Sequence, residues 1–174
     1  RELEEIDRKI KKLIEDIHRE NRDILRRIRE LIERIKKKNE DILREVRKLI
    51  KEIEDLVREG APKEELKKRI EDIMRRVEKL AKESRDEIDR ILEEVERLAE
   101  RSRRKIDKIM EDVKREVDDK VLKKLEDLLR EIKKDSDRVL EEARKLLEEI
   151  KRHSDEVLEE IKKLLDDIKK RVET

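Results

Sequence analysis

The strongest constraint on this chain is an apolar pattern that repeats every 18 residues. In the first third of the chain Ile6, Ile24 and Ile42 are equivalent, and the apolar residues between them recur at spacings of three and four. These spacings predict an α-helix. Because 18 residues make five turns at about 3.6 residues per turn, the repeat keeps one apolar stripe, about 120° wide, on the same side of a nearly straight helix.

The same repeat recurs in two further segments. The equivalent positions include Ile70, Ile88 and Ile106 in the second segment, and Val121, Val139 and Val157 in the third. Each stripe again spans about 120° at 3.6 residues per turn, which is wide enough for one helix to face two others.

Two turns divide the three segments. Gly60 is expected just past a helix end and Pro62 at the first position of the next helix. The second boundary has neither Gly nor Pro, but Asp118 can cap a helix there, with Val117 and Leu122 at the positions of a hydrophobic staple. The stripe also shifts by about 120° around the helix at this point, so one continuous helix would carry a broken stripe.

We therefore expect an all-α fold in which residues 1–174 form a single domain. The helices are predicted at about 2–59, 62–117 and 119–173. Each helix would be roughly 85 Å long at 1.5 Å per residue, and short connections force neighbouring helices to be antiparallel. The prediction is a long, nearly straight, up-down-up three-helix bundle.

All six Asn and Ser residues lie on the apolar stripes, two per helix and 18 residues apart. Folding the chain at its two turns places three of these residues at one level along the bundle and the other three at a second level. We therefore predict two polar layers in the core, the first formed by Asn21, Ser102 and Ser136, and the second by Asn39, Ser84 and Ser154. A buried polar group left unpaired costs roughly 1–3 kcal/mol. The layers are expected to penalise wrong registers more than they add stability.

Two histidines lie one wheel position outside the stripes, His18 on the first helix and His153 on the third. They are interpreted as boundary residues that flank the polar layers. Glu15 and His18 have the Glu-x-x-His spacing of di-iron bundles, but that site needs a second copy and inward carboxylates. Glu15 falls on the charged face, so we expect no metal, no cofactor and no catalytic residue.

The composition argues against several partners. Lys and Arg number 53 and Asp and Glu 52, so the net charge of +1 leaves no basic surface for nucleic acid. Aromatic residues are absent, which removes the platforms on which bases stack. Cysteine is absent as well, and apolar residues never run more than two in a row, as a membrane span would require.

The whole chain resembles de novo designed helical bundles with buried hydrogen-bond networks. The likeness rests on the 18-residue stripes, the paired Asn and Ser positions, and a surface built almost entirely from Glu, Lys, Arg and Asp. It also rests on the connection Gly60-Ala61-Pro62 and on the segments Lys82-Glu83-Ser84 and Lys134-Asp135-Ser136. The resemblance implies a scaffold with no natural substrate or cofactor, sometimes adapted as a cage that a further helix can enter.

Two functions remain in competition. The first is a designed structural scaffold, expected to be a monomer that requires no partner, because the charged faces carry no second apolar stripe. The alternative is a designed interaction module or cage whose three helices accept a further helix or assemble with a partner. An enzyme or metalloprotein is not expected.

Overall fold

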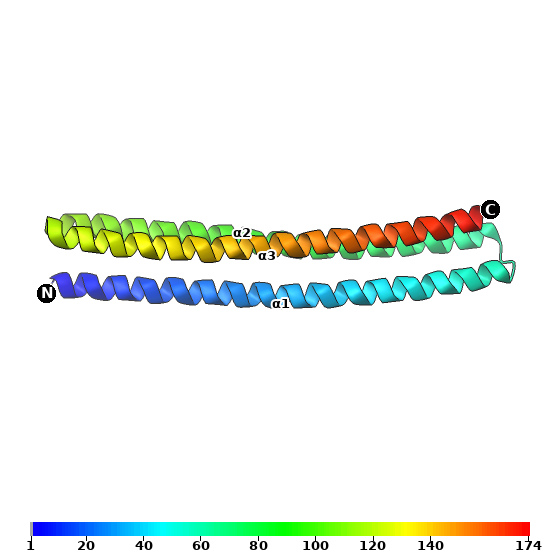
Figure 1. The fold of residues 1–174 in the computed structure, drawn as a ribbon, viewed down its shortest axis with the longest axis horizontal. Helices are drawn as coiled ribbons and strands as arrows, with labels where there is room; N and C mark the ends of the chain where they lie inside the picture. Colours follow the sequence, from blue (N-terminus) through cyan, green and yellow to red (C-terminus); the bar gives the residue numbers. More distant parts are fainter. Residues whose placement is uncertain (1) are drawn as a thin grey trace. The chain divides into compact units, whose positions relative to one another are not determined.

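The computed structural model describes residues 2–174, and side chains from residue 3 onward. Three helices account for nearly all of this part of the chain: α1 (Glu2–Arg58), α2 (Lys63–Glu116) and α3 (Asp119–Glu173) (Figure 1). No strand occurs among the described residues, so the all-α prediction is confirmed. Each observed helix end lies within one residue of the range expected from the apolar pattern.

The first connection closes α1 with a Schellman motif. The amide of Ala61 donates to the carbonyl of Leu56 at 3.0 Å, and the amide of Gly60 donates to the carbonyl of Val57 at 3.2 Å. Gly60 has a φ of 78°, the left-handed conformation that such a helix end requires. Pro62 lies one residue before α2, and its carbonyl accepts the first helical bond from Leu66.

The second connection is made by a helix cap. The carboxylate oxygen Oδ1 of Asp118 accepts a hydrogen bond from the amide of Val121 at 3.1 Å, and its backbone carbonyl accepts one from Leu122 at 2.9 Å. Val117 and Leu122 are both partly buried against the same apolar core, as a hydrophobic staple requires. The cap expected from the sequence is therefore present.

The chain forms two compact units, each built from segments of all three helices. Unit 1 comprises Arg1–Arg29 and Arg90–Leu147, and unit 2 comprises Glu30–Asp89 and Glu148–Thr174. Each unit has a core made from the predicted stripes. In unit 1 the core includes Ile6, Ile10, Ile17, Ile106, Val113 and Leu129. In unit 2 it includes Val46, Ile53, Ile70, Val77, Ile161 and Leu165.

Ion pairs between helices give the direction of the segments within each unit. In unit 1, Glu96 pairs with Arg144, and Arg103 pairs with Asp137. From the first pair to the second, the residue number rises on α2 and falls on α3. These segments are therefore antiparallel. In unit 2, Arg47 pairs with Glu160 and Glu54 with Arg171, so α1 and α3 run parallel there. Both relations agree with an up-down-up order of helices.

Candidate functional site

The second predicted layer lies in unit 2, where Asn39, Ser84 and Ser154 form what we call the Asn39 cluster. Asn39 Nδ2 donates a hydrogen bond to Ser154 Oγ at 3.1 Å. Asn39 and Ser84 are buried, and Ser154 is half-buried. All three side chains line one cavity of about 20 Å³, together with apolar residues of the three helices. The structure thus brings residues of α1, α2 and α3 together at this point.

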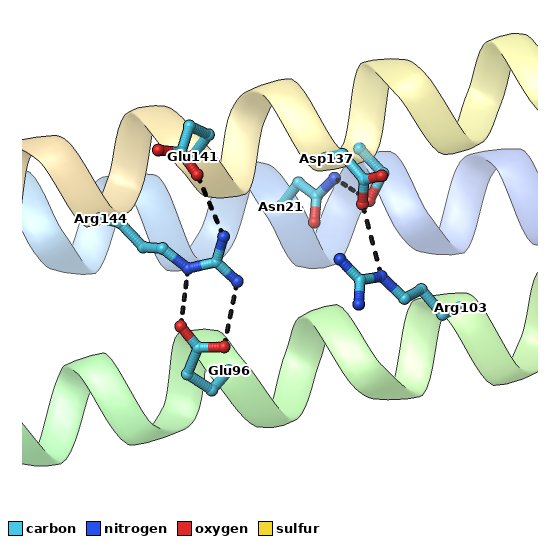
Figure 2. Close-up of polar contacts among 7 residues, drawn as sticks. Asn21, Glu96, Arg103, Asp137, Glu141 and Arg144 are labelled. Carbon is cyan, nitrogen blue, oxygen red and sulfur yellow. Dashed lines mark hydrogen bonds and ion pairs between the residues drawn. The ribbon is translucent and has the colours of Figure 1, made fainter.

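The first predicted layer lies in unit 1 as the Asn21 cluster, formed by Asn21, Ser102 and Ser136. All three residues are buried. Asn21 Nδ2 donates to Ser136 Oγ at 3.3 Å, and Figure 2 shows the amide oxygen of Asn21 turned away from this bond. Asn21 Oδ1 and Ser102 Oγ are buried without a hydrogen-bond partner. Here the structure joins α1 to α3 but leaves the hydroxyl from α2 unpaired.

The two histidines have different surroundings. His153 is half-buried, and its Nδ1 lies 3.4 Å from Asn39 Nδ2. Which of the two side chains donates in this contact depends on the tautomer of the imidazole. His18 is exposed, and only its backbone carbonyl is engaged, as the acceptor for Arg22 Nε at 3.3 Å. Only His153 therefore adds to a polar cluster.

A metal site would need several ligand side chains at one place. Among the residues that the structure describes, no group of three or more His, Cys, Asp or Glu side chains is arranged to hold a metal ion. Glu15, which begins the Glu-x-x-His segment, is exposed. The same part of the chain contains no helix long and apolar enough to cross a membrane.

A forked ion pair joins α2 and α3 beside the core of unit 1. Arg144 Nε and Nη2 donate to the two carboxylate oxygens of Glu96 at 2.6 and 3.0 Å, and Nη1 donates to Glu141 at 3.2 Å (Figure 2). Hydrogen bonding to Glu96 raises the pKa of Arg144 above its ordinary value, while partial burial acts in the opposite direction. Two parallel bonds fix the guanidinium in both distance and orientation.

A similar pair joins α1 and α2 in unit 1. Arg27 Nη1 lies 2.7 Å from Glu94 Oε2, and this hydrogen bond raises the pKa of Arg27. The sequence showed many charged residues at helical spacing but did not indicate which of them face another helix. The signal was weak because most exposed positions carry a charge, so each charged residue has several possible partners.

An apolar groove lies between α1 and α2 in unit 2, with a volume of about 220 Å³. Its apolar lining comprises Ile42, Val46, Leu49, Ile53, Ile73, Val77 and Leu80. Its charged rim comprises Glu45 and Glu52 on α1 and Arg69, Asp72 and Arg76 on α2. Arg76 and Glu45 form an ion pair of 3.2 Å across the groove. The apolar pattern did not predict this groove, because it arises at the edges of two stripes that were expected to be closed by packing.

Comparison with known proteins gives a structural likeness. No protein-family model matches the chain, and no curated protein matches it. One solved structure, described as a computationally designed three helix bundle, aligns with 99% of this chain and 84% of its own chain. The two sequences are 21% identical, and the TM-score is 0.43.

Proposed function

We propose that this chain is a designed structural scaffold with no natural biochemical activity, in which the two polar clusters set the register of the helices. One observation carries the proposal. The bonds Asn21–Ser136 and Asn39–Ser154 both join residues that are 115 positions apart. The two units thus use the same register between α1 and α3.

The chemistry of the clusters explains why this register is favoured. A slip of one heptad would place Asn39 level with Leu147 or Ile161 in place of Ser154. An amide that faces only apolar side chains loses its partners and costs roughly 1–3 kcal/mol. Such clusters therefore discriminate between registers even where they add little net stability. The proposal assigns no catalytic side chain, cofactor or metal.

The origin by design is supported by the regularity of the sequence. The 18-residue repeat holds in all three helices, and 60% of the residues are charged. The 53 basic and 52 acidic residues are interspersed along all three helices, the mixture of both signs that is typical of designed surfaces. Helix ends, caps and polar clusters agree with the same fold, which is the consistency expected of an idealised sequence.

Cross-linking tests the role of the clusters, because the chain contains no cysteine of its own. Arg47 Nη2 and Glu160 Oε1 lie 3.1 Å apart at the ends of two long side chains, so cysteines at these positions are too far apart for a direct disulfide but can be joined by a bifunctional thiol cross-linker. A variant with Arg47→Cys and Glu160→Cys therefore reports the observed register, and one with Arg47→Cys and Asp167→Cys reports a slip of one heptad. We expect efficient cross-linking in the first variant and almost none in the second.

Replacing both asparagines with leucine should change this outcome. With Asn21→Leu and Asn39→Leu in the background, the slipped cross-link should appear in a measurable fraction of molecules, because the penalty on that register is gone. The matched control is Ile10→Leu with Ile28→Leu, which alters two buried positions of α1 without touching a polar cluster. Equal yields of the slipped cross-link with and without the asparagines would refute the register role.

A second candidate function is favoured by the groove in unit 2. We propose that the groove between α1 and α2 accepts one further amphipathic helix. The α1 rim carries Glu45 and Glu52, and the α2 rim carries Arg69, Asp72 and Arg76, so the α1 rim is acidic and the α2 rim has a net positive charge. A helix with basic residues along the edge next to α1 and acidic residues along the other edge complements both rims. Its apolar face would cover the floor, and it would have to displace the ion pair between Arg76 and Glu45.

Two synthetic peptide helices of identical composition test this function. One has its basic edge toward α1, and the other has the charged edges exchanged. Fluorescence anisotropy should show tighter binding of the first peptide and a loss of binding on Leu49→Glu, which places a charge in the groove. Leu128→Glu is the control, because Leu128 is 40% exposed and lies in unit 1. Equal binding of both peptides, or no binding, would exclude this function and leave the scaffold proposal in place.

A further inference from the structure

The small cavity at the Asn39 cluster has the size and lining of a hydration site. Its volume is about 20 Å³, and one water molecule needs roughly 10–15 Å³ of accessible space. A buried water also needs two to four polar partners. Asn39, Ser84 and Ser154 all line the cavity, one from each helix. Both physical requirements for a bound water are therefore met at one place.

Ser84 is the member of the Asn39 cluster that α2 contributes. It is 5% exposed, and it takes part in none of the side-chain hydrogen bonds of the cluster, which join Asn39 to Ser154 and to His153. A serine hydroxyl offers one donor and two acceptor positions. Because Ser84 lines the cavity, its hydroxyl is available to a water held there.

The Asn21 cluster in unit 1 has almost the same surroundings. A shift of 18 residues maps nine of the ten residues that line the cavity in unit 2 onto residues of the same type in unit 1. The tenth position differs, because Ile161 in unit 2 corresponds to Ala143 in unit 1. Both residues are fully buried.

The apolar side chains around the Asn21 cluster are more buried than those around the Asn39 cluster, as a smaller residue at position 143 predicts. Ile24, Leu98, Ala99 and Leu140 are buried in unit 1, whereas their counterparts Ile42, Leu80, Ala81 and Leu158 in unit 2 are half-buried. A small side chain such as Ala143 allows closer packing around the polar groups of unit 1, whereas the larger Ile161 lines the cavity of unit 2 together with Ser84.

We propose that the cavity in unit 2 binds one water molecule, which bridges Ser84 to Asn39 and Ser154, and that the Asn21 cluster in unit 1 closes without one. The water connects Ser84 to the other two side chains of the cluster and completes a link between all three helices. This site goes beyond the scaffold function and does not depend on it. The two clusters have the same polar residues in sequence, but only the Asn39 cluster holds a bound water.

A crystal structure at high resolution tests the site directly. We expect an ordered water at hydrogen-bonding distance from Ser84 Oγ and from a polar atom of Asn39 or Ser154, with none at Ser102. Finding no water beside Ser84 would overturn the proposal. Water at both clusters would also overturn it, because the difference between Ile161 and Ala143 would then have no effect.

Magnetisation transfer from water to the protein provides a test in solution. We expect a direct cross-peak between water and the Nδ2 protons of Asn39, and its loss in Ser84→Ala. The matched control is Ser102→Ala, which removes the same hydroxyl from the other cluster and should leave the Asn39 cross-peak unchanged. Alanine preserves the helix in both variants, and circular dichroism checks this. A cross-peak that survives Ser84→Ala, or one that is lost in Ser102→Ala, would contradict a local water held by Ser84.

Discussion

At the scale of single residues, the two asparagines are equivalent in sequence but not in structure. Asn39 Nδ2 contacts both Ser154 Oγ and His153 Nδ1, whereas Asn21 bonds only to Ser136 and leaves its oxygen buried and unpaired. A hydrogen bond contributes about 1 kcal/mol, and an unpaired buried oxygen costs a similar amount or more. Asn21 therefore contributes less to stability than Asn39.

Truncation of the two side chains tests this difference. Asn39→Ala should lower the free energy of unfolding by about 1 kcal/mol more than Asn21→Ala, because only Asn39→Ala removes two satisfied contacts. Guanidinium unfolding followed by circular dichroism measures both values. Each variant is the control for the other, since both make the same change at the same position of the 18-residue repeat. Equal losses would show that the unpaired oxygen of Asn21 has no energetic effect.

At the scale of the helices, the end of α2 and the start of α3 depend on one side chain. Asp118 Oδ1 accepts a hydrogen bond from the amide of Val121, one of the amides without a helical partner at the start of α3. Asp118→Ala should therefore reduce the free energy of unfolding by about 1 kcal/mol. Asp119→Ala is the control, because Asp119 is the first residue of α3 and does not make this cap. A loss in Asp119→Ala as large as that in Asp118→Ala would argue against the cap.

The contact between α2 and α3 in unit 1 is reinforced by the fork between Arg144 and Glu96. Arg144 is 28% exposed in its side chain and Glu96 is 55% exposed, so solvent screens the pair. A double-mutant cycle with Arg144→Met and Glu96→Gln should give a coupling energy of roughly 0.2–1 kcal/mol at low salt. The coupling should fall in 1 M NaCl, where the Debye length is about 3 Å. A coupling of zero at low salt would show that the fork adds nothing to the contact.

At the scale of the whole chain, the sequence predicts the structure correctly for features that depend on a single helix. The stripes, the two turns and the cap at Asp118 follow from periodicity and local chemistry, and the structure contains all of them. The groove beside Leu49 and the cavity beside Ser84 depend on how side-chain volumes from different helices fit together. A pattern read along one helix has no information about that fit. For the same reason, burial of Ser102 was predictable, but its lack of a hydrogen bond was not.

The two units raise the question of whether the chain unfolds as one body, as the single-domain prediction requires. Each helix runs without interruption through the boundary between units, at residues 29–30, 89–90 and 147–148. Breaking a helix at its middle exposes backbone groups that the intact helix satisfies, so unfolding of one unit alone is costly. We therefore expect one cooperative transition for the whole chain.

Two core truncations test this cooperativity. Ile10 and Ile53 are each 1% exposed and lie in the cores of unit 1 and unit 2, respectively. Ile10→Ala and Ile53→Ala should each lower the free energy of unfolding by about 2–5 kcal/mol. If the helices couple the units, each variant shifts the single transition as a whole. Hydrogen exchange should then show weaker protection in both units of either variant. If protection falls only in the unit that carries the substitution, or the melt separates into two steps, the chain is two domains that share three helices.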